Sequence, residues 1–87
     1  MSENHADAEF LETVVKAIVD NPDAVKVERT VDEMGVLLTL SVDKPDMAQV
    51  IGRSGKTASA IRTLLRVVGM KSNARVNLKI NEPGENN

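Results

Sequence analysis

The sequence predicts a small α+β domain with the element order αββααβ, in which a three-stranded sheet carries three helices on one face. Apolar residues repeat at helical spacing in 7–20 and 58–68, and they alternate with polar residues in 25–31, 36–42 and 74–80. The 87 residues are 41% hydrophobic, which is enough for one core, and no internal repeat or long linker divides the chain.

The first helix is predicted from Asp7 to Asp20, because an apolar stripe runs along this otherwise polar segment. Its members are Phe10, Leu11, Val14, Val15 and Ile18. Asn21-Pro22 ends the helix, since the residue before a proline is forced out of the α region. We expect residues 1–7 to form a flexible segment and residues 8–81 to form the domain.

Two strands joined by a tight turn are predicted next. The first strand is indicated by the alternation of charged residues with Val25, Val27 and Val31. The second is indicated by the same alternation at Val36, Leu38, Leu40 and Val42. Because the connecting segment DEMG (Asp32–Gly35) is short, we expect the two strands to form an antiparallel hairpin.

The second half of the chain predicts two helices and a last strand. Pro45 begins a short helix that extends to about Ile51. A longer amphipathic helix is predicted to end at Gly69, with an apolar stripe of Ala58, Ile61, Leu64, Leu65 and Val68. The last strand is indicated by alternation at Ala74, Val76, Leu78 and Ile80. Residues 82–87 are polar and are predicted to be a disordered tail.

Charge is divided unevenly along the chain, although the formal net charge is only −2. Residues 1–42 carry nine acidic and three basic side chains, whereas residues 43–80 carry eight basic and two acidic ones. Such asymmetry indicates a polyanionic partner for the basic half. The alternative is a dipolar, solvated surface with no partner.

The composition excludes several classes of site. The chain has no cysteine, so it has no disulfide and no thiolate metal ligand, and Phe10 is its one aromatic residue. The first ten residues are acidic and lack an apolar stretch, so we expect no secretory signal. No apolar run approaches the roughly 18 residues that span a bilayer. These features predict a cytoplasmic domain that does not enter a membrane.

The stretch VIGRSGKT (Val50–Thr57) permits two interpretations, both of which bring backbone N–H groups close to a phosphate. As a nucleotide-binding P-loop, G-x-x-x-x-G-K-[ST], it would need a glycine at position 50, where the chain has Val50. A P-loop also follows a buried strand, whereas a short helix is predicted here. The P-loop is therefore excluded, and a G-x-x-G turn between two helices remains.

The G-x-x-G turn has the features of a clamp for a sugar-phosphate backbone. Gly52 and Gly55 lack Cβ atoms, so a backbone can approach closely, and the N–H groups that open the next helix favour an anion. Positive charge and one hydroxyl come from Arg53, Ser54 and Lys56, and from Arg62 and Arg66 on one face of that helix. An ordinary turn between two helices is the alternative interpretation.

The segment DMAQVIGRSGKTASAIRTLL resembles the core of a KH domain, and the αββααβ order is similar to the bacterial, type II arrangement of that family. The segment IVDNPDAVKVE is similar to the opening of one subgroup, the small single-KH bacterial RNA-binding proteins called KhpA. The resemblance covers roughly residues 8–81. It departs from the usual pattern at Ala58, where a larger aliphatic residue is common, and at Ala48, where KhpA-like chains often have glycine.

The resemblance implies a type II KH fold that grips single-stranded RNA at the G-x-x-G turn. By position, the clamp would be formed by Gly52, Arg53, Ser54 and Gly55, with electrostatic support from Lys56, Arg62 and Arg66. The base-binding groove would be lined by Val50 and Ile51, the third helix, the connection 69–74 and the last strand.

The resemblance also implies assembly and a cellular role. KhpA-like proteins form homodimers and pair with KhpB, a larger protein that joins a KH domain to another RNA-binding domain, and the role implied is that of an RNA chaperone or post-transcriptional regulator. Because the chain lacks Tyr and Trp, we expect weak, salt-dependent binding by one copy, with avidity from a second. The alternative function is a protein-interaction adaptor that uses an apolar helix face, and the alternative ligand is single-stranded DNA.

Other polar residues do not indicate catalysis, a metal or a cofactor. His5 is isolated in a polar segment, so it lacks partner ligands for a metal. Asp43 and Asp46 flank Lys44-Pro45 and are typical of a loop and a first helical turn rather than of a catalytic pair. Ser54 has no histidine nearby in the sequence to act as its base. We therefore expect a chain that is not an enzyme.

Overall fold

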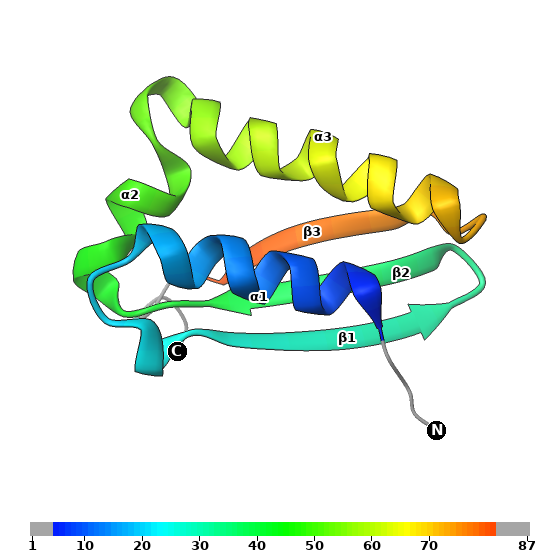
Figure 1. The fold of residues 1–87 in the computed structure, drawn as a ribbon, viewed down its shortest axis with the longest axis horizontal. Coiled ribbons are helices and arrows are strands. Elements are labelled where there is room, and N and C mark those ends of the chain that lie inside the picture. The colour runs from blue at the N-terminus through cyan, green and yellow to red at the C-terminus, as the bar shows by residue number, and fades with distance from the viewer. Residues whose placement is uncertain (1–4, 82–87) are drawn as a thin grey trace.

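A computed structural model describes residues 5–81 and arranges them in two layers, with the helices on one face of a sheet (Figure 1). The helices are α1 (Ala6–Ile18), α2 (Met47–Ile51) and α3 (Lys56–Lys71). The strands are β1 (Lys26–Asp32), β2 (Gly35–Ser41) and β3 (Val76–Asn81). Single 3₁₀ turns lie at η1 (Pro22–Ala24), η2 (Lys44–Asp46) and η3 (Arg53–Gly55). The predicted α+β class and the order αββααβ are confirmed.

The sheet has the strand order β1-β2-β3, so β2 is central and β3 is an edge strand. β1 and β2 form the predicted antiparallel hairpin, with Lys26 opposite Ser41 and Asp32 opposite Gly35. β3 returns parallel to β2, with Val36 opposite Val76. α1 packs over β1 and α3 over β3, so the long helix and the sheet edge lie side by side (Figure 1).

The core lies between the helices and the inward side of β2. Alternate β2 residues are buried as predicted, and Leu38 and Leu40 have no exposed surface. α1 contributes Leu11 and Val15, and α3 contributes the buried side chains of Ala58, Ile61 and Leu65. The aliphatic composition is therefore sufficient to fill one core without an aromatic centre.

β1 departs from its prediction at Val31, which is 60% exposed. The inward position before it is occupied by Arg29, whose Nε lies 3.0 Å from Oδ1 of the buried Asp7 on α1. α1 begins at Ala6, and β1 continues past this point (Figure 1). Val31 therefore has no helix above it, although it lies on the helix side of the sheet.

α3 departs from its prediction in two ways. It continues past Gly69 to Lys71, so Gly69 does not end the helix. Gly69 is instead packed against the following connection, where a Cβ would lie 2.6 Å from the carbonyl oxygen of Ala74. Leu64, predicted as part of the buried stripe, is 47% exposed, because the stripe that faces the sheet is narrower than the apolar pattern.

The expected domain limits are only partly described. α1 starts at Ala6 and buries Asp7, so the last two residues of the segment 1–7 are helical. Residues 1–4 and the expected tail 82–87 lie outside the described residues. Among the helices of residues 5–81, none has the length and apolarity to cross a membrane.

Candidate nucleic-acid interface

The G-x-x-G turn connects α2 to α3 through backbone conformations that favour glycine. Gly52 has φ +78°, and Ser54 and Gly55 follow one another in the left-handed region with φ +56° and +74°. The N–H of Gly52 donates to Ala48 at 2.8 Å, and that of Gly55 donates to Gly52 at 3.1 Å. The turn is thus fixed by its own backbone.

The two glycines of the turn have different surroundings. A Cβ at Gly52 would overlap the hydroxyl of Thr57 and lie 2.6 Å from its Cβ, so Gly52 is required for packing against the start of α3. A Cβ at Gly55 would have no neighbour within 4 Å. The open space above the turn is therefore at Gly55, where a ligand backbone has room to approach.

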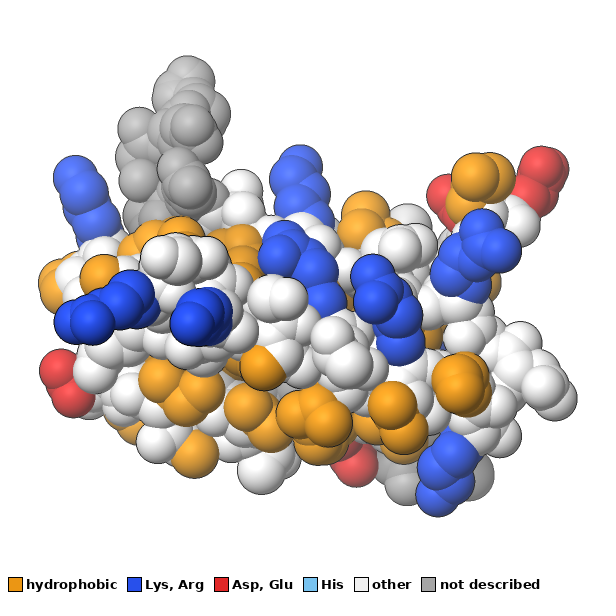
Figure 2. Space-filling view, turned by 90° about the horizontal axis from the view of Figure 1, so that it is seen from above, with side chains coloured by type: hydrophobic (Ala, Val, Ile, Leu, Met, Phe, Trp, Pro, Cys, Tyr) orange, Lys and Arg blue, Asp and Glu red, His pale blue; other side chains and the backbone are white. Residues whose placement is uncertain are grey.

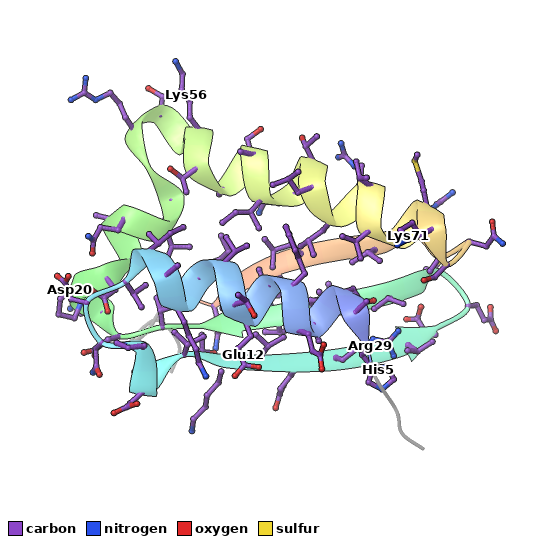
Figure 3. The ribbon with its side chains drawn as sticks, viewed as in Figure 1. His5, Glu12, Asp20, Arg29, Lys56 and Lys71 are labelled. Carbon is purple, nitrogen blue, oxygen red and sulfur yellow. The ribbon has the colours of Figure 1, made fainter. Side chains whose placement is uncertain are left out.

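The side chains around this opening are exposed and basic. Arg53, Ser54 and Lys56 are all exposed, and Lys56 points away from the body of the domain (Figure 3). The turn uses the N–H groups of Gly55 and Lys56 for its own hydrogen bonds, to Gly52 and to Arg53. Fewer backbone donors remain for an anion than the sequence suggested, so the basic side chains must supply most of the attraction.

A groove between α3 and β3 continues the basic surface away from the turn. A pocket of about 80 Å³ is lined by Arg62, Leu65, Arg66, Val76, Asn77 and Leu78. Figure 2 shows Lys and Arg side chains spread along this side of the molecule, from one end to the other. The ion pairs within residues 5–81 are Lys16–Glu12 and Arg29–Asp7, so the arginines of the groove are not neutralised by acids there.

The structure separates the two apolar residues expected in the groove. Ile51 is half-buried at the end of α2, beside the turn, and keeps some surface for contact. Val50 has no exposed surface and belongs to the core. Direct contact between Val50 and a base does not agree with this burial, because a side chain without exposed surface cannot reach a ligand.

Asp46 positions α2, although the sequence indicated only that it belongs to a first helical turn. Its side chain is 2% exposed, and its two oxygens accept hydrogen bonds from the backbone N–H groups of Asp20 and Asn21 at 3.1 and 3.0 Å. Asp43 accepts from the side chain of Asn21 at 3.1 Å. These contacts fasten the end of α1 to the segment before the turn. Asp43 and Asp46 thus act as structural hydrogen-bond acceptors in this region.

The side of α3 away from the basic groove is apolar and exposed. Ala60, Leu64 and Val67 are spaced so that they share one helix face, and Leu64 and Val67 are 47% and 53% exposed. Half-buried Phe10 and Val14 belong to the neighbouring α1. A row of hydrophobic side chains beside the basic one is visible in Figure 2. We call Ala60, Leu64 and Val67 the apolar face of α3.

Comparison with known proteins places this geometry in a family. The family model described as "KhpA/KhpB, KH domain" matches residues 8–80, which include the turn, all of β1 and β2, and β3 up to its last residue but one. The chain belongs to the KhpA/KhpB KH-domain family. The order of its helices and strands, and the place of the G-x-x-G turn between α2 and α3, agree with what the resemblance implied.

Relatives in this family match nearly end to end. The RNA-binding protein KhpA of Chlamydia pneumoniae is 42% identical over 74 residues, which are 85% of this chain and 95% of the relative. That of Clostridium acetobutylicum is 42% identical over 72 residues, 83% of this chain and 96% of the relative. That of Borreliella burgdorferi is 41% identical over 80 residues, 92% and 98% of the two chains. These KhpA relatives are named for binding and not for catalysis, in agreement with a non-enzyme.

Proposed function

We propose that this chain binds single-stranded RNA without catalysis, using the G-x-x-G turn as a backbone clamp. RNA binding is supported by the names of the KhpA relatives, which are RNA-binding proteins. The proposal also includes a role as an RNA chaperone or post-transcriptional regulator in the cytoplasm, as the resemblance to that family implies. Gly52 to Gly55 hold the backbone, Lys56, Arg62 and Arg66 attract phosphates, and Ile51 contacts a base at the start of the groove.

The observation that carries this proposal is the open space at Gly55. Of the two glycines of the turn, Gly55 is the one whose missing Cβ would have no heavy atom within 4 Å apart from Gly55 itself and its two chain neighbours, and Arg53 and Lys56 are exposed beside it. A phosphate can therefore reach the turn without displacing protein atoms, and it meets two cations there. Since the chain has no Tyr or Trp and its one aromatic residue, Phe10, lies on α1, these phosphate contacts dominate the binding free energy.

Fluorescence anisotropy with a labelled single-stranded RNA, at several salt concentrations, tests the clamp. The double variant Arg53→Asp/Ser54→Asp puts two carboxylates where the phosphates would lie, and we expect it to lose binding. The matched control is Lys26→Asp/Thr30→Asp, which makes the same charge change at two exposed positions of β1. Circular dichroism confirms that both variants are folded. Equal binding by the two variants would contradict the clamp, and a DNA of the same sequence tests the preference for RNA.

We further propose that the chain forms a homodimer through the apolar face of α3. Leu64 and Val67 are large, exposed and adjacent on the helix, and a second copy would bury them against the same residues. The basic groove lies on the other side of α3, so a dimer would leave both grooves accessible and would gain affinity through two linked sites. A KhpB-like multidomain RNA-binding protein is the alternative occupant of this face.

Sedimentation equilibrium of wild type and Leu64→Glu tests the dimer. We expect the wild type to be dimeric and the variant, which places a charge in the interface, to be monomeric and folded. If both are monomeric, homodimerisation is wrong, and the apolar face is left for the KhpB-like partner. The same variants test the adaptor alternative. If Leu64→Glu still binds RNA, and Arg53→Asp/Ser54→Asp loses RNA binding but still dimerises, then RNA binding and dimerisation use separate surfaces, and the chain does more than recruit a partner.

A further inference from the structure

The buried carboxylate of Asp46 lies at the start of α2, the short helix that leads into the glycine turn. An aspartate in this position commonly accepts a hydrogen bond from the first turn of its own helix. Asp46 makes no such bond to Met47–Ile51. Its two oxygens accept instead from the N–H groups of Asp20 and Asn21, just after α1, so the side chain joins two helices rather than capping one. We call these two hydrogen bonds the Asp46 link.

α2 depends strongly on this link because it has few other attachments of its own. It is five residues long, whereas an isolated helix shorter than about twelve residues is marginal in water. Within Met47–Ile51, Val50 is the one buried side chain. Asp46 is 2% exposed, so water competes little for its hydrogen bonds, and a charged acceptor makes them stronger than neutral ones.

The glycine turn is attached to the domain on two sides, and the two attachments differ. On one side it continues into α3, a helix of sixteen residues that packs over β3 (Figure 1). On the other side the N–H of Gly52 donates to Ala48 of α2 at 2.8 Å, so Gly52 follows any displacement of that short helix. A shift of α2 therefore moves Gly52 relative to Gly55 and changes the shape of the clamp.

We propose that Asp46 is a positioning residue for RNA binding, which holds the α2 side of the glycine turn in place before the RNA arrives. This inference rests on the proposed RNA-binding function. Asp46 acts without touching the ligand, because its side chain is buried and is bonded to the segment after α1. Figure 3 shows Asp20 of that segment at the same end of the domain as α2. A clamp that is ordered in advance loses less conformational entropy on binding, so the Asp46 link contributes to RNA affinity as well as to stability.

A second buried aspartate, Asp7, provides a matched comparison. It is 7% exposed and also makes a long-range contact, to Arg29 of β1. It lies in the first turn of α1, at the end of that helix away from α2 (Figure 1). Asp46→Asn and Asp7→Asn therefore make the same chemical change, remove the same charge and each weaken one attachment of α1. Only Asp46→Asn affects the segment that leads into the turn.

Anisotropy with a single-stranded RNA, under conditions in which circular dichroism shows each variant to be folded, is the first test. An asparagine at position 46 has one oxygen and one NH₂ group, so it cannot replace both carboxylate oxygens as acceptors. We expect Asp46→Asn to raise Kd about fivefold, and Asp7→Asn to change it by less than about twofold. Loss of a negative charge favours RNA binding in both variants, so weaker binding by Asp46→Asn is not an effect of net charge.

Amide hydrogen exchange, followed by NMR, tests the structural step without RNA. We expect the N–H of Gly52 to exchange faster in Asp46→Asn than in wild type, and at the wild-type rate in Asp7→Asn. If Asp46→Asn does not fold, Asn21→Ala replaces it, because this exposed residue loses its 3.1 Å bond to Asp43 and loosens the same joint without touching the core. We expect it to speed exchange at Gly52 and to raise Kd about twofold.

The outcomes separate this inference from the proposed function. RNA binding by wild type, with equal Kd values for Asp46→Asn and Asp7→Asn, overturns the positioning role and leaves the clamp intact. Unchanged exchange at Gly52 in both Asp46→Asn and Asn21→Ala also overturns it, because the link then does not hold the turn. Absence of RNA binding by the wild type overturns both the inference and the function on which it rests.

Discussion

α3 has a glycine near each end, and the surroundings of these two glycines are opposite. At Gly55, before the helix, a Cβ would point into open space. At Gly69, in the last turns of the helix, a Cβ would lie 2.6 Å from the carbonyl oxygen of Ala74 and 2.8 Å from a methyl group of Val76. At Gly69 the position of the missing side chain is thus occupied by other protein atoms, whereas at Gly55 it is empty.

This difference separates the glycines that are packed against other parts of the domain from the one whose missing side chain would point into open space. Gly52 resembles Gly69, since Thr57 occupies the position of its missing side chain. A G-x-x-G pattern alone makes Gly52 and Gly55 look equivalent. The structure indicates that a substitution at each glycine should alter a different property, either stability or ligand binding.

The largest effect on stability is expected at Gly69. Within an unhindered helix, replacing glycine by alanine stabilises by about 1 kcal/mol. Here the added Cβ meets backbone, which moves only at a cost, so we expect Gly69→Ala to lower the free energy of unfolding by about 2 kcal/mol. Urea denaturation measures this change, and Ser59→Ala, at an exposed position of the same helix, serves as the control. A stabilised Gly69→Ala would show that the close packing is wrong.

Within the turn the two glycines should differ, from a loss of stability as large as that at Gly69 to one about half as large. Gly52→Ala combines a positive φ with overlap against Thr57, so we expect a loss of about 2 kcal/mol of stability. Gly55→Ala has only the left-handed φ to overcome, and we expect about 1 kcal/mol. Chemical denaturation of both variants gives the ranking.

RNA affinity should also distinguish Gly52→Ala from Gly55→Ala. Once both proteins are shown to be folded, Gly55→Ala should weaken RNA binding even though it is the more stable of the two, because its methyl group enters the open space. Anisotropy measured well below the unfolding midpoint separates this effect from stability. Unchanged affinity of Gly55→Ala would mean that the open space is not the ligand site.

The smallest effect is expected at Ser54, which adopts the left-handed conformation with φ +56°. Glycine would relieve this strain but would also gain entropy in the unfolded chain, so we expect Ser54→Gly to stabilise by only about 0.5 kcal/mol. Thermal unfolding measures it. Ser72→Gly is the matched control, because Ser72 has φ −106° and glycine should destabilise there.

Much of the fold could be predicted from local patterns, and the failures lie where an element extends past its neighbour. β1 has the alternation of a half-buried strand, but Val31 lies beyond the first turn of α1 and is exposed. Leu64 continues an apolar stripe on α3 and is nevertheless exposed at its margin. A periodic pattern identifies the face of an element, and it carries no information on how far the opposing layer reaches.

The candidate site was predicted as a set of positions, but the role of each depends on long-range contacts. Val50 and Ile51 are adjacent aliphatic residues, and only packing of α2 makes one of them core and the other accessible. Asp46 gave no specific signal, because its partners are backbone N–H groups 25 and 26 residues away. The groove was expected along the third helix, the connection 69–74 and the last strand, and the edge position of β3 beside α3 is the tertiary feature that brings these segments together.

The sequence by itself determined the order of the elements, the position of the G-x-x-G turn and the concentration of basic residues in the second half of the chain. These features depend on periodicity, on turn-forming residues and on composition, which are local or additive. Tertiary structure alone decided that β3 runs parallel to β2 at the sheet edge, that Gly52 is packed while Gly55 is open, and that Asp46 joins α1 to α2. Each of these requires two distant segments to meet, and a contact of that kind is set by the packing of the whole core.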